Sequence, residues 1–159
     1  MLLASVRTVG ADGPRRDARE QFLGIHRGRL TLTMPPQTSR VLSIRRLTGR
    51  PQVIGTNMHV LQGHHEITRL AWDDKTGRLS GRCRRATGMS GSLYLYVPPG
   101  YRPHFDFPLG PGSARLTHVG GNLWKQELEF QENKLEWSIP FDGSASGPAP
   151  TAPAEPITL

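Results

Sequence analysis

The sequence predicts an all-β protein, an antiparallel β-sandwich of about eight strands with a disordered C-terminal tail. Three observations lead to this fold class. The 159 residues include 18 glycines and 14 prolines, which disfavour the interiors of helices and central strands. Most apolar residues fall in short alternating runs, the pattern of half-buried strands, and turn-forming residues separate these runs. No segment shows the period of a helix longer than a turn or two.

Each predicted strand carries apolar side chains at alternate positions and ends at turn-forming residues. In the first half of the chain the expected strands are 2–9, 29–34, 40–46 and 52–55. In the second half they are 66–72, 78–84, 92–97, 114–119, 123–130 and 135–141. Residues 73–77 are expected to form a hairpin turn, because aspartate begins turns and glycine supplies a positive φ.

Strand phase also assigns side chains to faces of the sheet. Leu42 and Ile44 share one face of their strand and are expected to point into the core. Leu93 and Leu95 are expected to do the same in the strand 92–97.

The chain is expected to have three regions. Residues 1–20 form an N-terminal extension that is partly disordered, because a polar, charged segment follows the strand 2–9. Residues 21–142 form the β-sandwich domain. Residues 143–159 form a disordered tail, since proline, alanine, glycine and serine replace large apolar residues there.

Composition excludes several classes of protein. The formal net charge is +7, but the arginines are scattered, so basic charge alone identifies no partner. Cys83 is the only cysteine, and no intrachain disulfide can form. No apolar run approaches the length of a transmembrane helix, no membrane partner is expected, and the first residues are a poor match to a signal peptide.

No catalytic or metal-binding pattern stands out. His59, His64 and His65 cluster next to Glu66, but neighbouring residues of a strand point to opposite faces and do not converge easily on one ion. The paired carboxylates of a glycosidase are also not indicated, because turns and solvent-facing strand positions explain the candidates. We therefore expect no metal, no cofactor and no catalytic role for this chain.

Aromatic residues support one binding hypothesis, because the CH faces of sugars stack on flat rings. Tyr94 and Tyr96 share the face opposite Leu93 and Leu95, and in a sandwich this second face usually meets solvent. Together with Tyr101 they are the candidate carbohydrate-binding residues. The alternative is that they cover the sheet edge or pack against another domain. The tryptophans fall in apolar phases and are expected in the core.

Several short segments occur in an order that resembles a known module. They are Phe22-Leu23-Gly24, Leu30-Thr31-Leu32, 40–45, 50–56, 59–63, Trp72-Asp73, Leu79-Ser80-Gly81, 93–98 and Gly100-Tyr101. In this order and spacing they resemble the C-terminal β-sandwich module that follows the catalytic barrel in bacterial glycoside hydrolases of the α-galactosidase-like type. The resemblance covers about half of the chain.

In such enzymes the acid/base and nucleophile carboxylates lie in the barrel, so no catalytic residue is carried over to this chain. The resemblance implies a non-catalytic accessory module, structural first and carbohydrate-binding second, whose partner is the catalytic barrel. The alternative hypothesis is a free-standing basic β domain that binds nucleic acid or another polyanion, which salt-dependent DNA binding would indicate.

Overall fold

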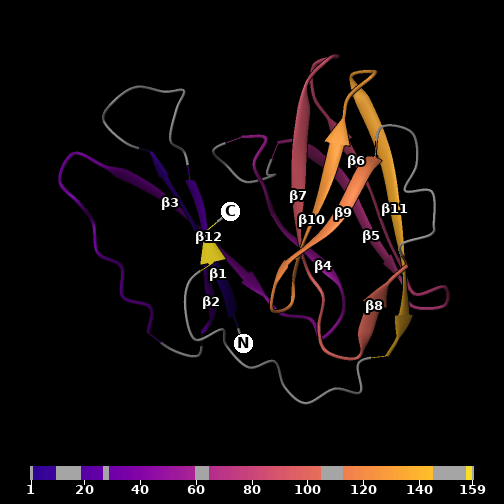
Figure 1. Ribbon diagram of the computed structural model, residues 1–159, viewed down its shortest axis with the longest axis horizontal. Coiled ribbons are helices and arrows are strands. Elements are labelled where there is room, and N and C mark those ends of the chain that lie inside the picture. Colours follow the sequence, from indigo (N-terminus) through magenta and orange to yellow (C-terminus); the bar gives the residue numbers. More distant parts are fainter. Residues whose placement is uncertain are drawn as a thin grey trace. The chain divides into compact units, whose positions relative to one another are not determined.

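The computed structural model describes residues 2–9, 19–26, 29–59, 65–104, 113–144 and 157–158. These residues form twelve β-strands and no helix, so none of them lies in a helix that could cross a membrane (Figure 1). The chain divides into two compact units. Unit 1 comprises Met1–Leu47 and Pro150–Leu159, and unit 2 comprises Thr48–Ala149.

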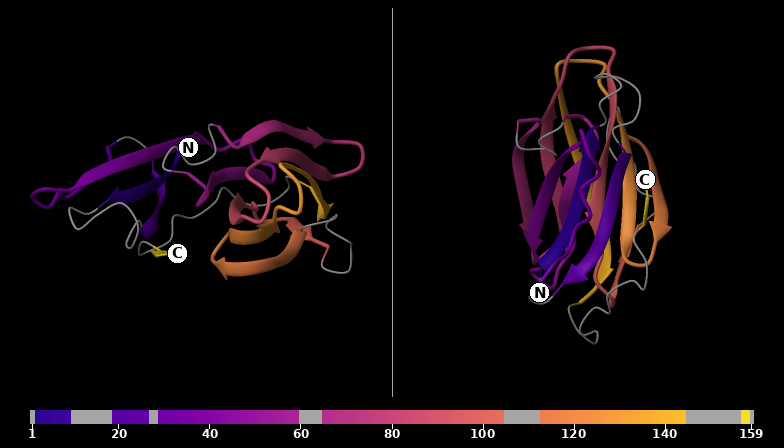
Figure 2. Two further views of the ribbon diagram at one scale, coloured as in Figure 1. Left: turned by 90° about the horizontal axis from the view of Figure 1, so that it is seen from above. Right: turned by 90° about the vertical axis from the view of Figure 1, so that its left-hand side faces the viewer.

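Unit 2 is a sandwich of two four-stranded antiparallel sheets. One sheet has the order β4-β7-β10-β9, from β4 (Gln52–Thr56), β7 (Ser90–Tyr96), β9 (Ser113–Gly120) and β10 (Leu123–Glu129). The other has the order β5-β6-β11-β8, from β5 (Ile67–Asp73), β6 (Arg78–Arg84), β8 (Tyr101–Pro103) and β11 (Lys134–Gly143). The β5–β6 and β9–β10 hairpins lie on opposite sides of the sandwich (Figure 2). The predicted antiparallel β-sandwich of about eight strands is confirmed.

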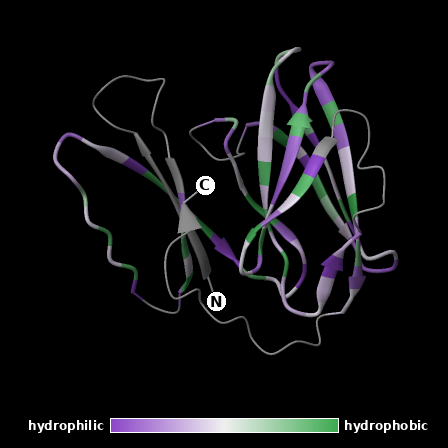
Figure 3. Ribbon diagram, in the orientation of Figure 1, coloured by the Kyte–Doolittle hydropathy of each residue, from purple (hydrophilic) through white to green (hydrophobic). Residues whose placement is uncertain are grey.

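One hydrophobic core fills the space between the two sheets. Leu93, Leu95 and Leu128 from the first sheet are fully buried, and they belong to one cluster with Cys83 and Ile139 from the second. Figure 3 shows the alternation of hydrophobic and hydrophilic bands along the sandwich strands. The inward orientation predicted for Leu93 and Leu95 is therefore confirmed.

The hairpin turn predicted between β5 and β6 is also confirmed. The Asp73 carboxylate accepts hydrogen bonds from the Lys75 backbone N–H at 2.9 Å and from the Thr76 hydroxyl at 2.8 Å. These bonds, that of Thr76 foremost, lower the pKa of Asp73. Gly77 closes the turn at a φ of 60°.

Unit 1 is a single four-stranded antiparallel sheet with the order β12-β2-β1-β3. Its strands are β1 (Leu2–Val9), β2 (Arg19–His26), β3 (Ser39–Arg46) and β12 (Ile157–Thr158). The strand predicted at the start of the chain is thus present with its predicted limits.

The compact units divide the chain differently from the predicted regions. Residues 21–26 and 39–46, expected in the sandwich domain, belong to β2 and β3 of unit 1. Two residues of the expected tail form β12, which pairs with β2. The disorder predicted for 10–18 and 145–156 concerns segments that lie outside the described residues.

The strand predicted at 29–34 is wrong, because these residues belong to no sheet. Alternating hydrophobicity makes a strand only where a neighbouring strand can supply hydrogen bonds. In unit 1, β2 already lies between β1 and β12, and β3 pairs with the other edge of β1.

The prediction that Leu42 and Ile44 face a core is also wrong, since their exposed fractions are 38% and 53%. The register explains the difference. Ser5 of β1 lies opposite both Phe22 of β2 and Ser43 of β3, so the face that buries Phe22 carries Ser43. Leu42 and Ile44 therefore lie on the opposite face of the sheet.

Candidate functional site

The first two candidate tyrosines lie in the interior. Tyr94 and Tyr96 on β7 have exposed fractions of 5% and 1%, so the expectation of a solvent-facing pair is wrong. β7 is an inner strand with β4 on one side and β10 on the other, and residues of both neighbours lie opposite the tyrosines. Burial raises the pKa of Tyr96, and the Asn122 side chain acts in the opposite direction.

The third candidate, Tyr101, has a different environment. It is half-buried on β8, and its ring meets the half-buried Trp72 ring of β5 edge-on, with 5.7 Å between centroids. The Trp72 ring also lies against the Phe141 ring of β11, with 5.9 Å between the ring centroids. Three strands of one sheet thus supply an aromatic cluster at its end, and two of the rings reach the protein surface.

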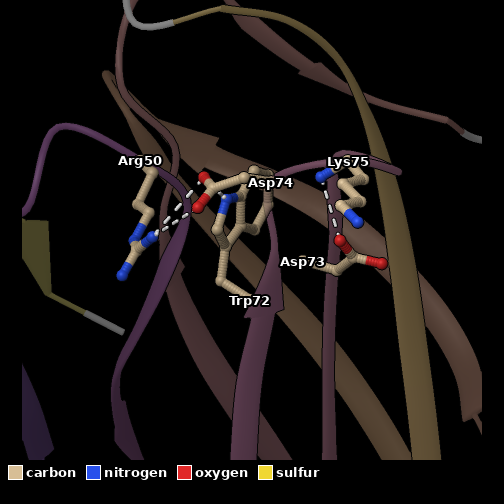
Figure 4. A network of polar contacts seen from close by, with 5 residues as sticks. All are labelled: Arg50, Trp72, Asp73, Asp74 and Lys75. Carbon is tan, nitrogen blue, oxygen red and sulfur yellow. Dashed lines mark hydrogen bonds and ion pairs between the residues drawn. The ribbon is translucent and has the colours of Figure 1, made fainter.

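Polar groups lie beside the Trp72 ring (Figure 4). The Trp72 Nε1–H donates a hydrogen bond of 2.6 Å to Asp74 Oδ1. The Arg50 guanidinium, from the segment before β4, lies 3.3 Å from Asp74 Oδ2 and 3.5 Å from Oδ1. The side chains of Arg50 and Asp74 are 43% and 78% exposed. The site therefore combines two half-buried rings, one guanidinium and one carboxylate.

Sequence reasoning found only Tyr101 of this group. Trp72 was expected in the core, and Asp74 was explained by the hairpin turn. Trp72 does pack against the core, but it is the next-to-last residue of β5, so its ring lies where the core meets the surface. A tryptophan directly before a polar turn is the signal that could have found the site. Arg50 had no local signal, because its partner is 24 residues away.

Unit 2 also contains a polar groove of about 520 Å³, which we call the β7–β10 groove. Its lining includes Asn57, Arg85, Ser90, Ser92, Glu127 and Glu129. The Glu127 side chain is half-buried and that of Glu129 is exposed.

The histidines give no metal centre in the described part of the chain. The rings of His59 and His65 meet edge-on with 6.0 Å between centroids, and His64 lies outside the described residues. Glu66 is buried. Among the described residues, no three His, Cys, Asp or Glu side chains are arranged to hold a metal ion.

Cys83 is a core residue rather than an accessible nucleophile. Its side chain is fully buried, and the Trp137 Nε1–H donates a hydrogen bond of 3.3 Å to its sulfur. Burial raises the pKa of the thiol from 9.0 to about 11, so it is protonated at neutral pH.

Comparisons with family models, with curated proteins and with solved structures find no match to this chain. Unit 2 has two surface features with functional chemistry: the Trp72–Tyr101 cluster, which comprises Trp72, Tyr101, Arg50 and Asp74, and the β7–β10 groove.

Proposed function

We propose that the chain is a non-catalytic accessory module of a glycoside hydrolase and that it binds carbohydrate at the Trp72–Tyr101 cluster. One observation carries the sugar-binding role: the half-buried Trp72 ring contacts the Tyr101 ring and donates a hydrogen bond to Asp74, which pairs with Arg50. The ligand is a sugar residue with one apolar CH face and hydroxyl groups around its rim.

Each part of the cluster matches one part of such a ligand. The accessible parts of the Trp72 and Tyr101 rings offer apolar surface to the CH face. The Asp74 carboxylate can accept further hydrogen bonds from hydroxyls, and the Arg50 guanidinium has further donors for their oxygens. The Trp72–Asp74 hydrogen bond fixes the ring before binding, which lowers the entropic cost of association.

The accessory role rests on the short sequence segments whose order along the chain resembles such modules. The sandwich fold is compatible with this role. The partner is then a catalytic barrel. The neighbouring reading frames test this part: a barrel encoded directly beside this chain supports it, and unrelated neighbours argue against it without affecting sugar binding.

Titration of the full chain with a panel of neutral oligosaccharides, followed by tryptophan fluorescence, tests the binding role. Tyr101→Ala and Asp74→Ala should each weaken binding by about tenfold, the effect of losing a stacking ring or a charged hydrogen-bond partner. Lys75→Ala, a change in the same turn, is the matched control and should leave affinity unchanged.

Equal affinities for the Asp74 and Lys75 variants would contradict the proposed site. No binding to any glycan of the panel would leave only the structural role. Salt-dependent binding to DNA, with no sugar binding, would favour the polyanion-binding domain instead.

A further inference from the structure

The register of β7 and β10 pairs the residues that line the β7–β10 groove. Ser90 lies directly opposite Glu129, and Ser92 lies directly opposite Glu127. Directly opposed residues of an antiparallel pair share a face, with Cβ atoms about 5 Å apart. Each pair therefore presents a hydroxyl next to a carboxylate on the same face of the sheet.

Two further side chains are held in place by the backbone of β7. The Asn57 Oδ1 accepts a hydrogen bond of 2.7 Å from the Ser92 N–H, and the Arg85 guanidinium donates to the Ser90 carbonyl. Gly91 makes this arrangement possible. A Cβ atom there would lie 2.9 Å from the Arg85 guanidinium and 2.8 Å from the Met58 sulfur. The Asn57 and Arg85 side chains are thus positioned before any ligand binds.

The charges of the groove balance. Lys125 and Glu127 form an ion pair of 2.9 Å and neutralise one another. Arg85 and Glu129 line the same groove, yet neither forms an ion pair with any charged group in the described part of the chain. The groove therefore offers a strong donor and a strong acceptor but no net charge.

A neutral ligand with adjacent hydroxyl groups satisfies both of these residues. Each hydroxyl can accept a hydrogen bond from the guanidinium and donate one to the carboxylate. Further hydroxyls meet the side chains of Ser90 and Asn57. The cavity volume of about 520 Å³ is in the usual range for small-molecule sites.

We propose that the β7–β10 groove is a binding site for a neutral saccharide, whose vicinal diol bridges Arg85 and Glu129. This site shares no residue with the Trp72–Tyr101 cluster, so it stands whether or not that cluster binds sugar. Unit 2 then has a polar sugar site on one sheet that works by hydrogen bonding rather than by stacking.

The test is titration of the full, isotope-labelled chain with glucose, galactose, mannose and cellobiose, followed by amide NMR. We expect saturable shifts at Ser90–Ser92 and Glu127–Glu129 with at least one of these sugars. Glu129→Ala should weaken that binding by about tenfold, because a charged hydrogen-bond partner is lost. Glu132→Ala, which removes an exposed carboxylate outside the groove, is the matched control and should not change it.

Arg85→Ala should weaken binding to a similar degree, with Arg84→Ala as its control. Because Arg85 also holds the Ser90 carbonyl, Glu129→Ala decides the case if the Arg85 variant folds poorly. Three results would overturn the proposal: no saturable groove shifts with any of the four sugars, equal affinities for the Glu129 and Glu132 variants, or tighter groove binding of glycine than of every sugar. The last result would indicate a zwitterionic ligand.

Discussion

Replacing Cys83 with alanine will remove a large part of the alkaline destabilisation of unit 2. In the folded protein, burial raises the pKa of the thiol from 9.0 to about 11. Below pH 9 the thiol is protonated in both states, and its contribution to stability is fully present. As the pH rises through 9 towards 11, the unfolded chain releases this proton first, so the contribution is lost. Two pKa units at about 1.36 kcal/mol each set an upper limit of about 3 kcal/mol on this loss, which is reached only above pH 11.

Urea unfolding near the two ends of this pH range measures the effect. All three tryptophans lie in unit 2, so their fluorescence follows the unfolding of this unit. Between pH 8 and pH 11 the unmodified protein should lose about 2 kcal/mol more than Cys83→Ala, because at pH 11 the thiol of the folded protein is itself about half ionised. Tyr96 also has a raised pKa, but it is present in both proteins and cancels in the comparison. Equal losses in the two proteins would refute the reasoning.

Two other predictions concern unit 2. Gly81→Ala should lower the free energy of unfolding by about 1–3 kcal/mol, because the new methyl group would lie 2.5 Å from the Trp137 ring and 2.9 Å from the Arg69 carbonyl oxygen. Unchanged urea unfolding would show that the ring moves aside freely. Glu136→Gln should leave the neutral-pH unfolding midpoint unchanged, since its partner Arg82 and the carboxylate are both exposed. Arg82 lowers the pKa of Glu136, so the stability that this ion pair contributes should be lost only as the pH falls through the acid range. A clear loss of stability in Glu136→Gln at neutral pH would contradict this view.

The strands of the sandwich could be predicted from the sequence because their information is local. Leu93 and Leu95 alternate with other residues over one short run, and both are fully buried. The turn at Asp73 to Gly77 depends on the turn preferences of its own five residues. Alternation and turn chemistry each act within a few residues, so a sequence pattern can reveal them.

Sheet order and register are not local, and the errors follow from that. Alternation shows that Tyr94 and Leu93 lie on different faces, but it cannot show that β7 is an inner strand. It also cannot show which side chains of β3 lie on the same face of the sheet as the buried Phe22. For this reason Leu42 was wrongly expected in the core. The Arg50–Asp74 contact was missed for the same reason, because it joins segments that only the folded chain brings together.

The two units differ in when their parts are synthesised. The sandwich is one continuous segment, Thr48–Ala149, whereas the sheet of unit 1 includes β12, in which Ile157 pairs with Phe22 of β2. A ribosome synthesises every strand of the sandwich before it reaches β12. Because domains fold as units during synthesis, the sandwich can close first, while unit 1 must wait for the last residues of this chain to complete its sheet. A cut after Ala149 would accordingly remove a strand from unit 1 and none from the sandwich.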